Sequence, residues 1–282
     1  MLDRKLISSL STSEDGPVTI GGWVETLRDQ KRIQFIIIRD ESGSVQVTYP
    51  RPADEDALAD QVSALSHGSF VIIKGKLKHD ERVKLGGLEV KIHALEVTGA
   101  AEAEPPIAED SSVDKRMDWR FLDLRRPQAN LIFRAQTAFE HGMRSWWVDH
   151  NWIEIHTPKF MASASESRAE LFEVGYFDTT AYLAQSPQFF KQMAQPAGFG
   201  AVFEIAPAFR ADPSFTARHA TEFTSVDAEM SWVESHHDVM AMHEQVLVAG
   251  ITAVVDKCGQ DITDLLGIEL TVPSTPFPRV QC

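Results

Sequence analysis

The chain has 282 residues, which is enough for two domains of ordinary size or one large one. Apolar residues make up 43% and charged residues 24%, as in ordinary globular proteins, and we find no apolar run of about 18 residues that predicts a membrane-spanning helix. The two cysteines cannot build a disulfide framework or a four-ligand zinc site, and a net charge of −14 by itself argues against nucleic-acid binding. We therefore expect no membrane partner and a reducing, cytoplasmic location.

The acidic average hides local differences in charge. Residues 21–51 are close to neutral, with five basic and four acidic side chains, and residues 115–134 are clearly basic. A protein that is acidic overall can still present a basic face to a polyanion. Nucleic-acid binding therefore stays open for these two stretches.

Short β-branched and aromatic runs occupy the first hundred residues. Leu58, Val62 and Leu65 recur at helical spacing and predict a helix over 53–65. Short strands with one helix after the third or fourth are typical of a small closed barrel such as the OB-fold. A barrel without a nucleic-acid role fits this pattern equally well. The predicted strands are 18–20, 23–25, 33–39, 45–49, 69–77 and 89–97, with turns at 41–44 and at Gly86-Gly87.

A composition change marks the domain boundary. Residues 100–112 are mostly Ala, Glu, Pro and Ser, with Pro105-Pro106 in the middle, as in a linker. We therefore expect a barrel domain over 1–100, a linker or hinge over 101–115, and a second domain over 116–282.

The second domain mixes strands with a few long helices. These do not alternate strictly, which favours an α+β domain with an antiparallel sheet flanked by helices. Ser186 followed by Pro187 predicts a capped helix start. The predicted helices are 128–149, 188–194 and 236–257, and the predicted strands are 152–156, 172–177, 181–184, 202–209 and 222–233.

The last two strands before the final helix carry candidate nucleotide-binding residues. Arg210 ends one strand and Arg218 precedes the next, so a hairpin would hold two guanidinium groups that can clamp a polyphosphate. Phe223 could offer a ring on which a purine stacks. Taken singly, such residues are more often a solvated charge or a core aromatic.

Polar residues nearby could bind a small acid. Gln188 and Lys191 lie three residues apart on one helical face, and Asp227 and Glu229 alternate, so each pair shares a side. Together with the arginines they could activate an acid with a nucleotide, by positioning and charge stabilisation. Each alone could equally be a surface residue.

Several motifs make the second domain resemble the class II aminoacyl-tRNA synthetases, in detail the aspartyl group of archaeal and eukaryotic type. Motif one of the class matches 128–159, with its proline at Pro158, and motif two matches 209–230. The Gln-Ser-Pro-Gln-Phe-Phe-Lys-Gln stretch at 185–192 and the Phe-Leu-Asp-Leu-Arg segment at 121–125 resemble motifs of the aspartyl, asparaginyl and lysyl subgroup. The first domain resembles the subgroup's anticodon-binding OB-fold, through residues 22–24, Arg28, Phe35, 39–40 and Gln46.

The resemblance implies roles for the motif-two residues. Arg210 is expected to be the catalytic arginine, on the adenylate α-phosphate and a carboxylate oxygen of the substrate. Asp212 is expected at the adenosine, Arg218 and His219 at the γ-phosphate side, and Phe223 against the adenine ring.

The resemblance also implies the remaining pockets. Glu166, Gln188 and Lys191, together with Arg210, are expected to bind aspartate. In the barrel, Arg28, Phe35 and Gln46 are expected to read the anticodon, Phe35 by stacking and the other two by hydrogen bonds to base edges.

The implied reaction has two steps, with ATP and Mg²⁺ as cofactors. Aspartate and ATP give aspartyl-adenylate, which is passed to the 3′ end of tRNA(Asp); whether tRNA(Asn) is a second acceptor stays open. The motif-one helix of the family builds a two-fold interface, so the resemblance implies a homodimer.

The chain departs from the family pattern at several places. Ser167-Arg168 follow Glu166 where the family has glycine, Asp212 replaces the usual Glu, and 213–216 lack the usual acidic run. No segment matches the third class motif, whose region would supply the acidic Mg²⁺ ligands. If the sequence is the whole polypeptide, adenylate formation should be badly impaired.

Two other functions therefore stay open beside the ligase. One is a non-catalytic tRNA-binding paralogue that keeps the barrel, and the other is an adenylate-forming paralogue that acts on something other than tRNA. His236, His237 and His243 bring at most two imidazoles together, so we expect no metal site there.

Overall fold

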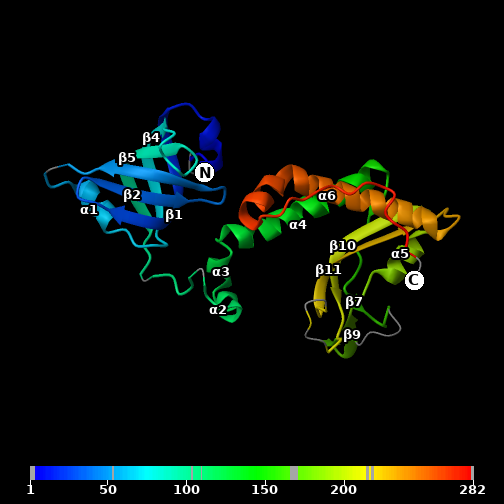
Figure 1. Cartoon of the computed structure of the whole chain (residues 1–282). Coiled ribbons are helices and arrows are strands. Elements are labelled where there is room, and N and C mark those ends of the chain that lie inside the picture. Colours follow the sequence, from blue (N-terminus) through cyan, green and yellow to red (C-terminus); the bar gives the residue numbers. More distant parts are fainter. Residues whose placement is uncertain are drawn as a thin grey trace. The chain divides into compact units, whose positions relative to one another are not determined.

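The computed structural model describes residues 4–280 apart from 53, 103, 109, 166–170, 214–215 and 217–218. The chain divides into two compact units, Met1–Arg126 and Pro127–Cys282, each described separately below (Figure 1).

The first unit contains a five-stranded closed barrel. Its strands are β1 (Gly16–Asp29), β2 (Ile33–Arg39), β3 (Ser44–Pro50), β4 (Phe70–His79) and β5 (Leu88–Gly99), paired in the order β1-β2-β3-β5-β4. Only β3 and β5 pair in parallel. Helix α1 (Ala57–Ser63) follows β3, and a 3₁₀ helix, Ile7–Thr12, precedes the barrel. This topology confirms the predicted OB-fold.

Strand β1 corrects the sequence-based prediction. Two strands, 18–20 and 23–25, were expected, but one 14-residue strand runs through Gly21 and Gly22. A Cβ atom on Gly22 would overlap the carbonyl oxygen of Arg39 on β2. Gly22 therefore allows β1 and β2 to approach each other closely, and it does not form a turn.

The segment after the barrel contains two short helices, α2 (Val113–Asp118) and α3 (Arg120–Asp123). The buried carboxylate of Asp123 accepts hydrogen bonds from Arg120 and Arg126, at 2.5 and 3.1 Å. These ion pairs account locally for Arg120 and Asp123 of the Arg-Phe-Leu-Asp-Leu-Arg segment. The guanidinium carbon of Arg125 lies 4.6 Å from the centre of the Trp23 ring.

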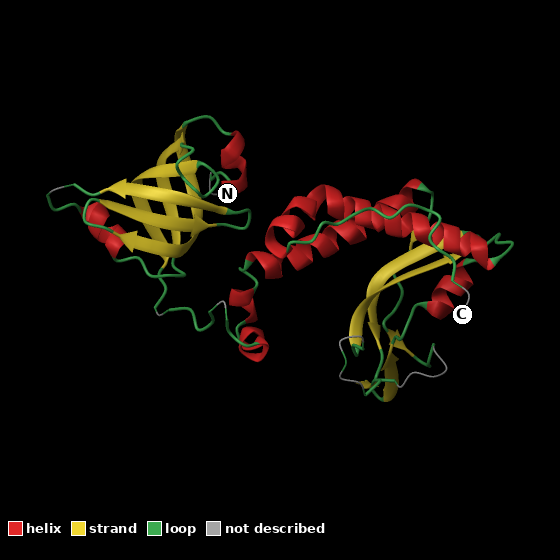
Figure 2. Cartoon of the chain, in the orientation of Figure 1, coloured by secondary structure: helices red, strands yellow, loops and turns green. Residues whose placement is uncertain are grey.

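The second unit contains two small sheets and three helices among its described residues (Figure 2). One sheet has the order β11-β10-β6, with β10 and β11 antiparallel and β6 added in parallel; the other has the order β7-β9-β8. The helices are α4 (Pro127–Asp149), α5 (Gln188–Ala194) and α6 (His236–Leu266), and the strands are β6 (Ile153–Glu154), β7 (Phe160–Met161), β8 (Glu173–Tyr176), β9 (Thr179–Leu183), β10 (Ala201–Phe209) and β11 (Glu222–Met230).

Several element ends differ from the prediction for local reasons. β6 is shorter than 152–156 because only two of its residues pair with β10. β11 stops at Met230, before Trp232 takes a φ of 61°, and α6 continues beyond Lys257 to a C-cap at Gly267, whose φ is 68°. Pro187 is the N-cap of α5 and not its first helical residue.

Helices α4 and α6 pack closely on each other and on the sheet. Trp147 of α4 is buried and stacks on Phe203 of β10, with ring centroids 4.6 Å apart. By length and composition α6 could cross a membrane, but core helices of soluble proteins pass the same test, and Val254, Cys258 and Ile262 of α6 pack against α4.

Glycine sets the distance between these helices. A Cβ atom on Gly142 would lie 2.6 Å from the carbonyl oxygen of Ala249 in α6. The contacting atom belongs to the backbone, so the helices themselves would have to separate.

Replacing Gly142 by Ala should lower the free energy of unfolding by about 1–2 kcal/mol, because the added methyl group overpacks the crossing. Gly259→Ala is the matched control: its Cβ would meet only Val255, at 3.7 Å, and should gain up to about 1 kcal/mol from helix propensity. Urea unfolding of both variants measures the two signs, and a Gly142→Ala protein as stable as the control would contradict the helix-crossing argument.

Candidate functional site

The two faces of the β10–β11 pair have different surroundings. Phe203, Ile205 and Ala228 pack in the core cluster with Met143 and Trp147 of α4. Since side chains alternate along a strand, the neighbouring positions point to the opposite face. On that face, directly opposed pairs are Glu204 with Asp227, Ala206 with Ser225, and Ala208 with Phe223.

A charge cluster occupies one end of this face. The ammonium group of Lys191, from α5, lies 2.6 Å from Asp227 Oδ1 and 3.4 Å from Glu229 Oε2. Ser225 Oγ donates a hydrogen bond of 2.9 Å to the other oxygen of Asp227. The Lys191 side chain is only 12% exposed. As predicted, Asp227 and Glu229 point to one side, and both contact Lys191.

An arginine and an aromatic ring occupy the other end. The guanidinium carbon of Arg210 lies 5.4 Å from the centre of the Phe223 ring, and the Arg210 backbone N–H donates to the carbonyl of Thr221 at 2.9 Å. Arg210 Nε is buried and has no hydrogen-bond partner in the described part of the chain. Such a donor favours an added acceptor. Phe223 and Asp227 are four residues apart, so the two ends are separated by roughly 13 Å.

A third polar group braces the same face, and the sequence analysis missed its role. Glu204 is 3% exposed and accepts hydrogen bonds from Thr157 N at 2.7 Å, Thr157 Oγ1 at 2.8 Å and Lys159 Nζ at 3.0 Å. A Glu inside an otherwise apolar strand run was the available signal, because a buried carboxylate requires partners. Glu204 ties the segment after β6 to β10.

The remaining predicted residues show fewer contacts. The Gln188 backbone N–H donates to Ser186 Oγ at 3.3 Å, and the Gln188 side chain forms no hydrogen bond with any described residue. Asp212 is partly exposed, and His219 Nδ1 lies 2.6 Å from Thr216 Oγ1. Glu166 and Arg218 lie outside the described residues.

On the barrel, the three predicted anticodon residues line one groove of about 780 Å³. Arg28 and Phe35 face each other across β1 and β2, and Gln46 is paired with Ile37 on the next strand. The other lining residues come from these strands, from Gln30, from Glu89 and from the segment 80–85, and include the cations Arg39, Arg82 and Lys84. Hydrogen bonds from Arg82 lower the pKa of Asp80, which stays ionised.

The groove combines an aromatic ring with cations that are not neutralised by acids. Arg39 pairs with Glu25 and Arg82 with Asp80, whereas Arg28 and Lys84 have no carboxylate partner among residues whose positions are described. A ring for stacking and free cations for phosphates are the usual elements of a single-stranded nucleic-acid site.

No group of three or more His, Cys, Asp or Glu side chains that could hold a metal ion occurs among the described residues.

Known protein families match both units. Residues 112–282 match the class II tRNA synthetases (D, K and N), and residues 18–98 match the OB-fold nucleic acid binding domain. The chain belongs to the class II tRNA synthetases of this group.

Its similarity to individual relatives points to the aspartate branch. It is 37% identical to the aspartate–tRNA(Asp) ligase of Thermoplasma acidophilum, over 100% of this chain and 66% of the relative. It is 38% identical to the aspartate–tRNA(Asp/Asn) ligase of Methanopyrus kandleri, over 99% of this chain and 66% of the relative. The chain thus spans slightly less than two thirds of the length of these relatives.

Solved structures agree on the fold. The asparaginyl-tRNA synthetase from Pyrococcus horikoshii, complexed with asparaginyl-adenylate, superimposes with a TM-score of 0.87 and 31% identity, over 94% of this chain and 61% of that one. A putative aspartyl-tRNA synthetase from Leishmania major gives a TM-score of 0.84 and 27% identity, over 95% of this chain and 56% of that one.

Replacing Glu204 by Ala should destabilise the second unit by about 1–3 kcal/mol, because Lys159 and the Thr157 N–H, both partly buried, lose their acceptor. Chemical denaturation measures the loss. Glu173→Ala, on the exposed strand β8, is the control and should change stability by less than about 0.5 kcal/mol. Equal stability of the two variants would contradict the bracing role of Glu204.

Proposed function

We propose that this chain carries the aspartate-activating and anticodon-reading parts of an aspartate–tRNA ligase. Aspartate and ATP form aspartyl-adenylate, and the aspartyl group is then transferred to tRNA(Asp), in the cytoplasm. The observation that carries this proposal is the β10–β11 face, with a charge cluster at Lys191 and an arginine–aromatic pair at Arg210.

The charge cluster matches two of the three charged groups of aspartate. Its substrate would bring an α-ammonium group and a side-chain carboxylate. Lys191 can bind the carboxylate, while Asp227 and Glu229, which now contact Lys191, can accept from the ammonium group. Asparagine has a neutral amide in place of that carboxylate, so the cation favours aspartate.

The arginine end matches the nucleotide. Arg210 would bind the α-phosphate through the buried Nε that has no partner, and Phe223 would stack the adenine ring. His219 and Arg218 would contact the γ-phosphate side, and Asp212 the adenosine.

The chemistry in the first step is a displacement at phosphorus. A carboxylate oxygen of aspartate attacks the α-phosphorus of ATP, and pyrophosphate leaves. The chain's own contribution is to align the two substrates and to stabilise the negative charge on the phosphoryl oxygens through Arg210. In the second step, a ribose hydroxyl of the tRNA 3′ end attacks the aspartyl carbonyl carbon, and AMP leaves.

Mg²⁺ is expected to neutralise the phosphates of ATP when it is bound. The described residues offer no cluster of acidic ligands for it, so no residue of this chain is assigned to the metal.

The aspartate pocket is completed by Gln188 and Glu166 in this proposal. Gln188 lies one helical turn before Lys191, and its side chain is free for a ligand as far as the described residues show. Glu166 is assigned only by its place in the family motif.

The proposed activity is tested by aspartate-dependent exchange of pyrophosphate into ATP. Arg210→Ala should lower the exchange rate by at least about a hundredfold, because one preorganised charge is lost from the transition state. Arg134→Ala, which removes a partly exposed pair with Asp261 between α4 and α6, is the control and should retain the rate.

Two results would contradict the ligase proposal. Unchanged exchange in Arg210→Ala would remove Arg210 from the reaction. No exchange in the unmodified chain, with tRNA still bound, would favour the non-catalytic tRNA-binding function. Charging of tRNA(Asp) and tRNA(Asn) by the active protein decides whether both are acceptors.

The barrel groove is proposed to read the anticodon, with Phe35 stacking on a base and with Arg28 and Gln46 forming hydrogen bonds to base edges.

Phe35→Ala should weaken tRNA binding about tenfold to a hundredfold, because a stacked base contributes about 1–3 kcal/mol. Fluorescence anisotropy measures the affinity. Val97→Ala, on an exposed part of β5 outside the groove, should bind tRNA like the unmodified protein; an equal loss in both variants would contradict the stacking role.

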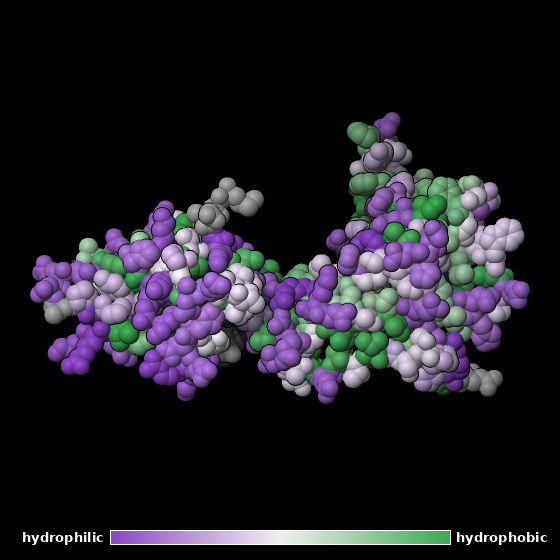
Figure 3. Space-filling model, turned by 90° about the horizontal axis from the view of Figure 1, so that it is seen from above, coloured by the Kyte–Doolittle hydropathy of each residue, from purple (hydrophilic) through white to green (hydrophobic). Residues whose placement is uncertain are grey.

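We also propose a homodimer formed through α4. Ile132 and Phe133 of α4 are 61% and 48% exposed, and hydrophobic colour spreads over the second unit more widely than over the barrel (Figure 3). Sedimentation equilibrium should give twice the chain mass for the unmodified protein and the single mass for Phe133→Asp. Lys257→Gln, at an exposed position of α6 outside the α4 surface, should remain dimeric, and a monomeric unmodified protein would contradict the proposal.

A further inference from the structure

A second cationic hollow lies on the barrel, apart from the anticodon groove. It has a volume of about 300 Å³ and shares no residue with the groove. It is formed by residues preceding and beginning β1 and by the middle of β4 and β5. The lining residues are Lys5, Pro17, Val18, Thr19, Lys74, Gly75 and His93.

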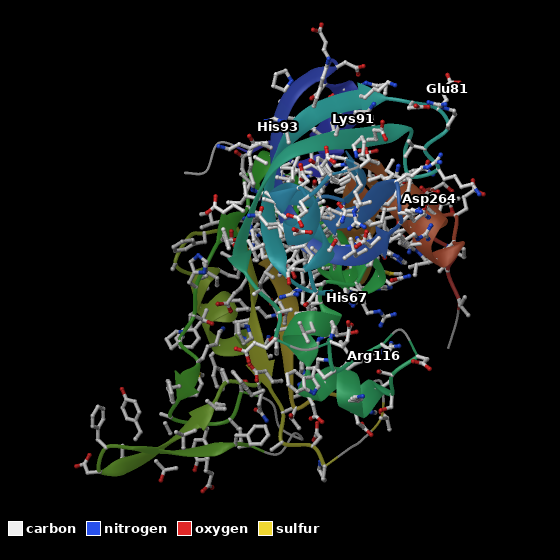
Figure 4. All side chains as sticks on the ribbon, turned by 90° about the vertical axis from the view of Figure 1, so that its left-hand side faces the viewer. His67, Glu81, Lys91, His93, Arg116 and Asp264 are labelled. Atoms are coloured by element: carbon white, nitrogen blue, oxygen red, sulfur yellow. The ribbon has the colours of Figure 1, made fainter. Side chains whose placement is uncertain are left out.

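The strands beside the hollow bring like charges together. Lys76 of β4 is directly opposite Lys91 of β5. Lys74 and His93 are exposed to solvent on the same outer face of these two strands. Figure 4 labels Lys91 and His93 along β5. Like charges directly opposite each other destabilise an antiparallel pair. Such a like-charge pair does not stabilise the fold, so a functional role for these lysines is favoured.

A β-bulge directs His93 toward the hollow. Lys74 is paired with Ala94 and Gly75 with Ile92, so His93 is the extra residue between two pairs. A bulge bends the strand and changes the direction of a side chain. Gly75 permits this arrangement, since a Cβ there would lie 2.6 Å from the carbonyl oxygen of Lys91. The bulge thus gathers His93 with Lys74 at the same place.

Acidic residues neutralise only the margin of this surface. Lys91 lies 3.7 Å from Glu89, and Lys78 lies 3.9 Å from Asp80. Asp15 contacts His79 at 2.6 Å; its pKa is lowered mainly by the hydrogen bonds from His79, with a smaller contribution from the charge of Lys76.

The centre of the surface keeps its charge. No carboxylate lies within ion-pair distance of Lys5, Lys74, Lys76 or His93 in the described part of the chain. The ammonium group of Lys5 donates to the hydroxyl of Ser13, at 3.2 Å. In a chain of net charge −14, three lysines with no acidic partner among the described residues, together with the imidazole of His93, form a local site for an anion around one hollow.

We propose that this hollow binds the phosphate backbone of the RNA, at a segment other than the bases read in the groove. Lysine side chains bind phosphates by charge, and contacts to phosphates orient an RNA without reading its sequence. The hollow has no exposed aromatic or large aliphatic side chain among its lining residues, which a membrane-binding surface would use. This inference rests on the proposed tRNA binding.

The test compares two RNAs on the full 282-residue chain. One is full-length tRNA(Asp), and the other is a single-stranded heptamer with the sequence of its anticodon loop. Anisotropy titrations from about 50 to 200 mM KCl give the affinity and its salt dependence for each RNA. The variant is the double substitution Lys74→Gln and Lys76→Gln. The control is Lys257→Gln, an exposed lysine of α6.

The double variant should bind full-length tRNA about tenfold more weakly, with a salt slope reduced by about two. It should bind the heptamer as the unmodified protein does, and its melting temperature should not fall, because a like-charge contact is removed. The Lys257→Gln control should match the unmodified protein with both RNAs.

Other results would overturn the inference. Unchanged tRNA affinity, or an equal loss for tRNA and heptamer, contradicts a separate backbone contact. Loss of binding to phosphatidylserine vesicles with tRNA affinity retained would assign the surface to a membrane. If Phe35→Ala still weakens both RNAs while the lysine variant does not, only this inference fails; if the unmodified chain binds neither RNA, the proposed function fails as well.

Discussion

The pairing register of β10 and β11 determines both the core and the candidate site. It places Phe203 and Ala228 toward α4, and Glu204 and Asp227 on the opposite face. Side chains alternate along a strand, so a shift by one residue would bury the two carboxylates against Trp147 and expose the core residues. Burial on the helical side therefore fixes the positions of the polar groups on the other side.

The charges on the polar face depend on residues from outside the hairpin. Glu204 and Asp227 face each other across the strands, where two like charges repel. Each has its own lysine, Lys159 for Glu204 and Lys191 for Asp227. Lys191 comes from α5, so the position of this short helix and the charge balance of the sheet are coupled. A substrate that carries an ammonium group and a carboxylate could replace these ion pairs with its own, and no buried charge would be left unpaired.

The sequence predicted the elements better than their contacts. β-branched and aromatic runs predicted the barrel strands, helical spacing predicted α4, and the Ser186-Pro187 pair predicted the start of α5. Gly21 and Gly22 divided β1 in the prediction, because a sequence does not show that the Arg39 backbone approaches them. The common side of Asp227 and Glu229 followed from the period of a strand, but their lysine partner depends on tertiary packing. The same holds for Glu204, whose partners are 45 and 47 residues away.

The most direct test of the central claim, that one sheet face binds an aminoacyl-adenylate between Lys191 and Arg210, is calorimetric titration with a sulfamoyl analogue of aspartyl-adenylate. The unmodified chain should bind it, and Lys191→Met and Arg210→Ala should each weaken binding by about a hundredfold, since each leaves a ligand charge unpaired. The asparaginyl analogue should bind more weakly than the aspartyl one to the unmodified chain only. Unchanged affinity for the aspartyl analogue in both variants would contradict the account.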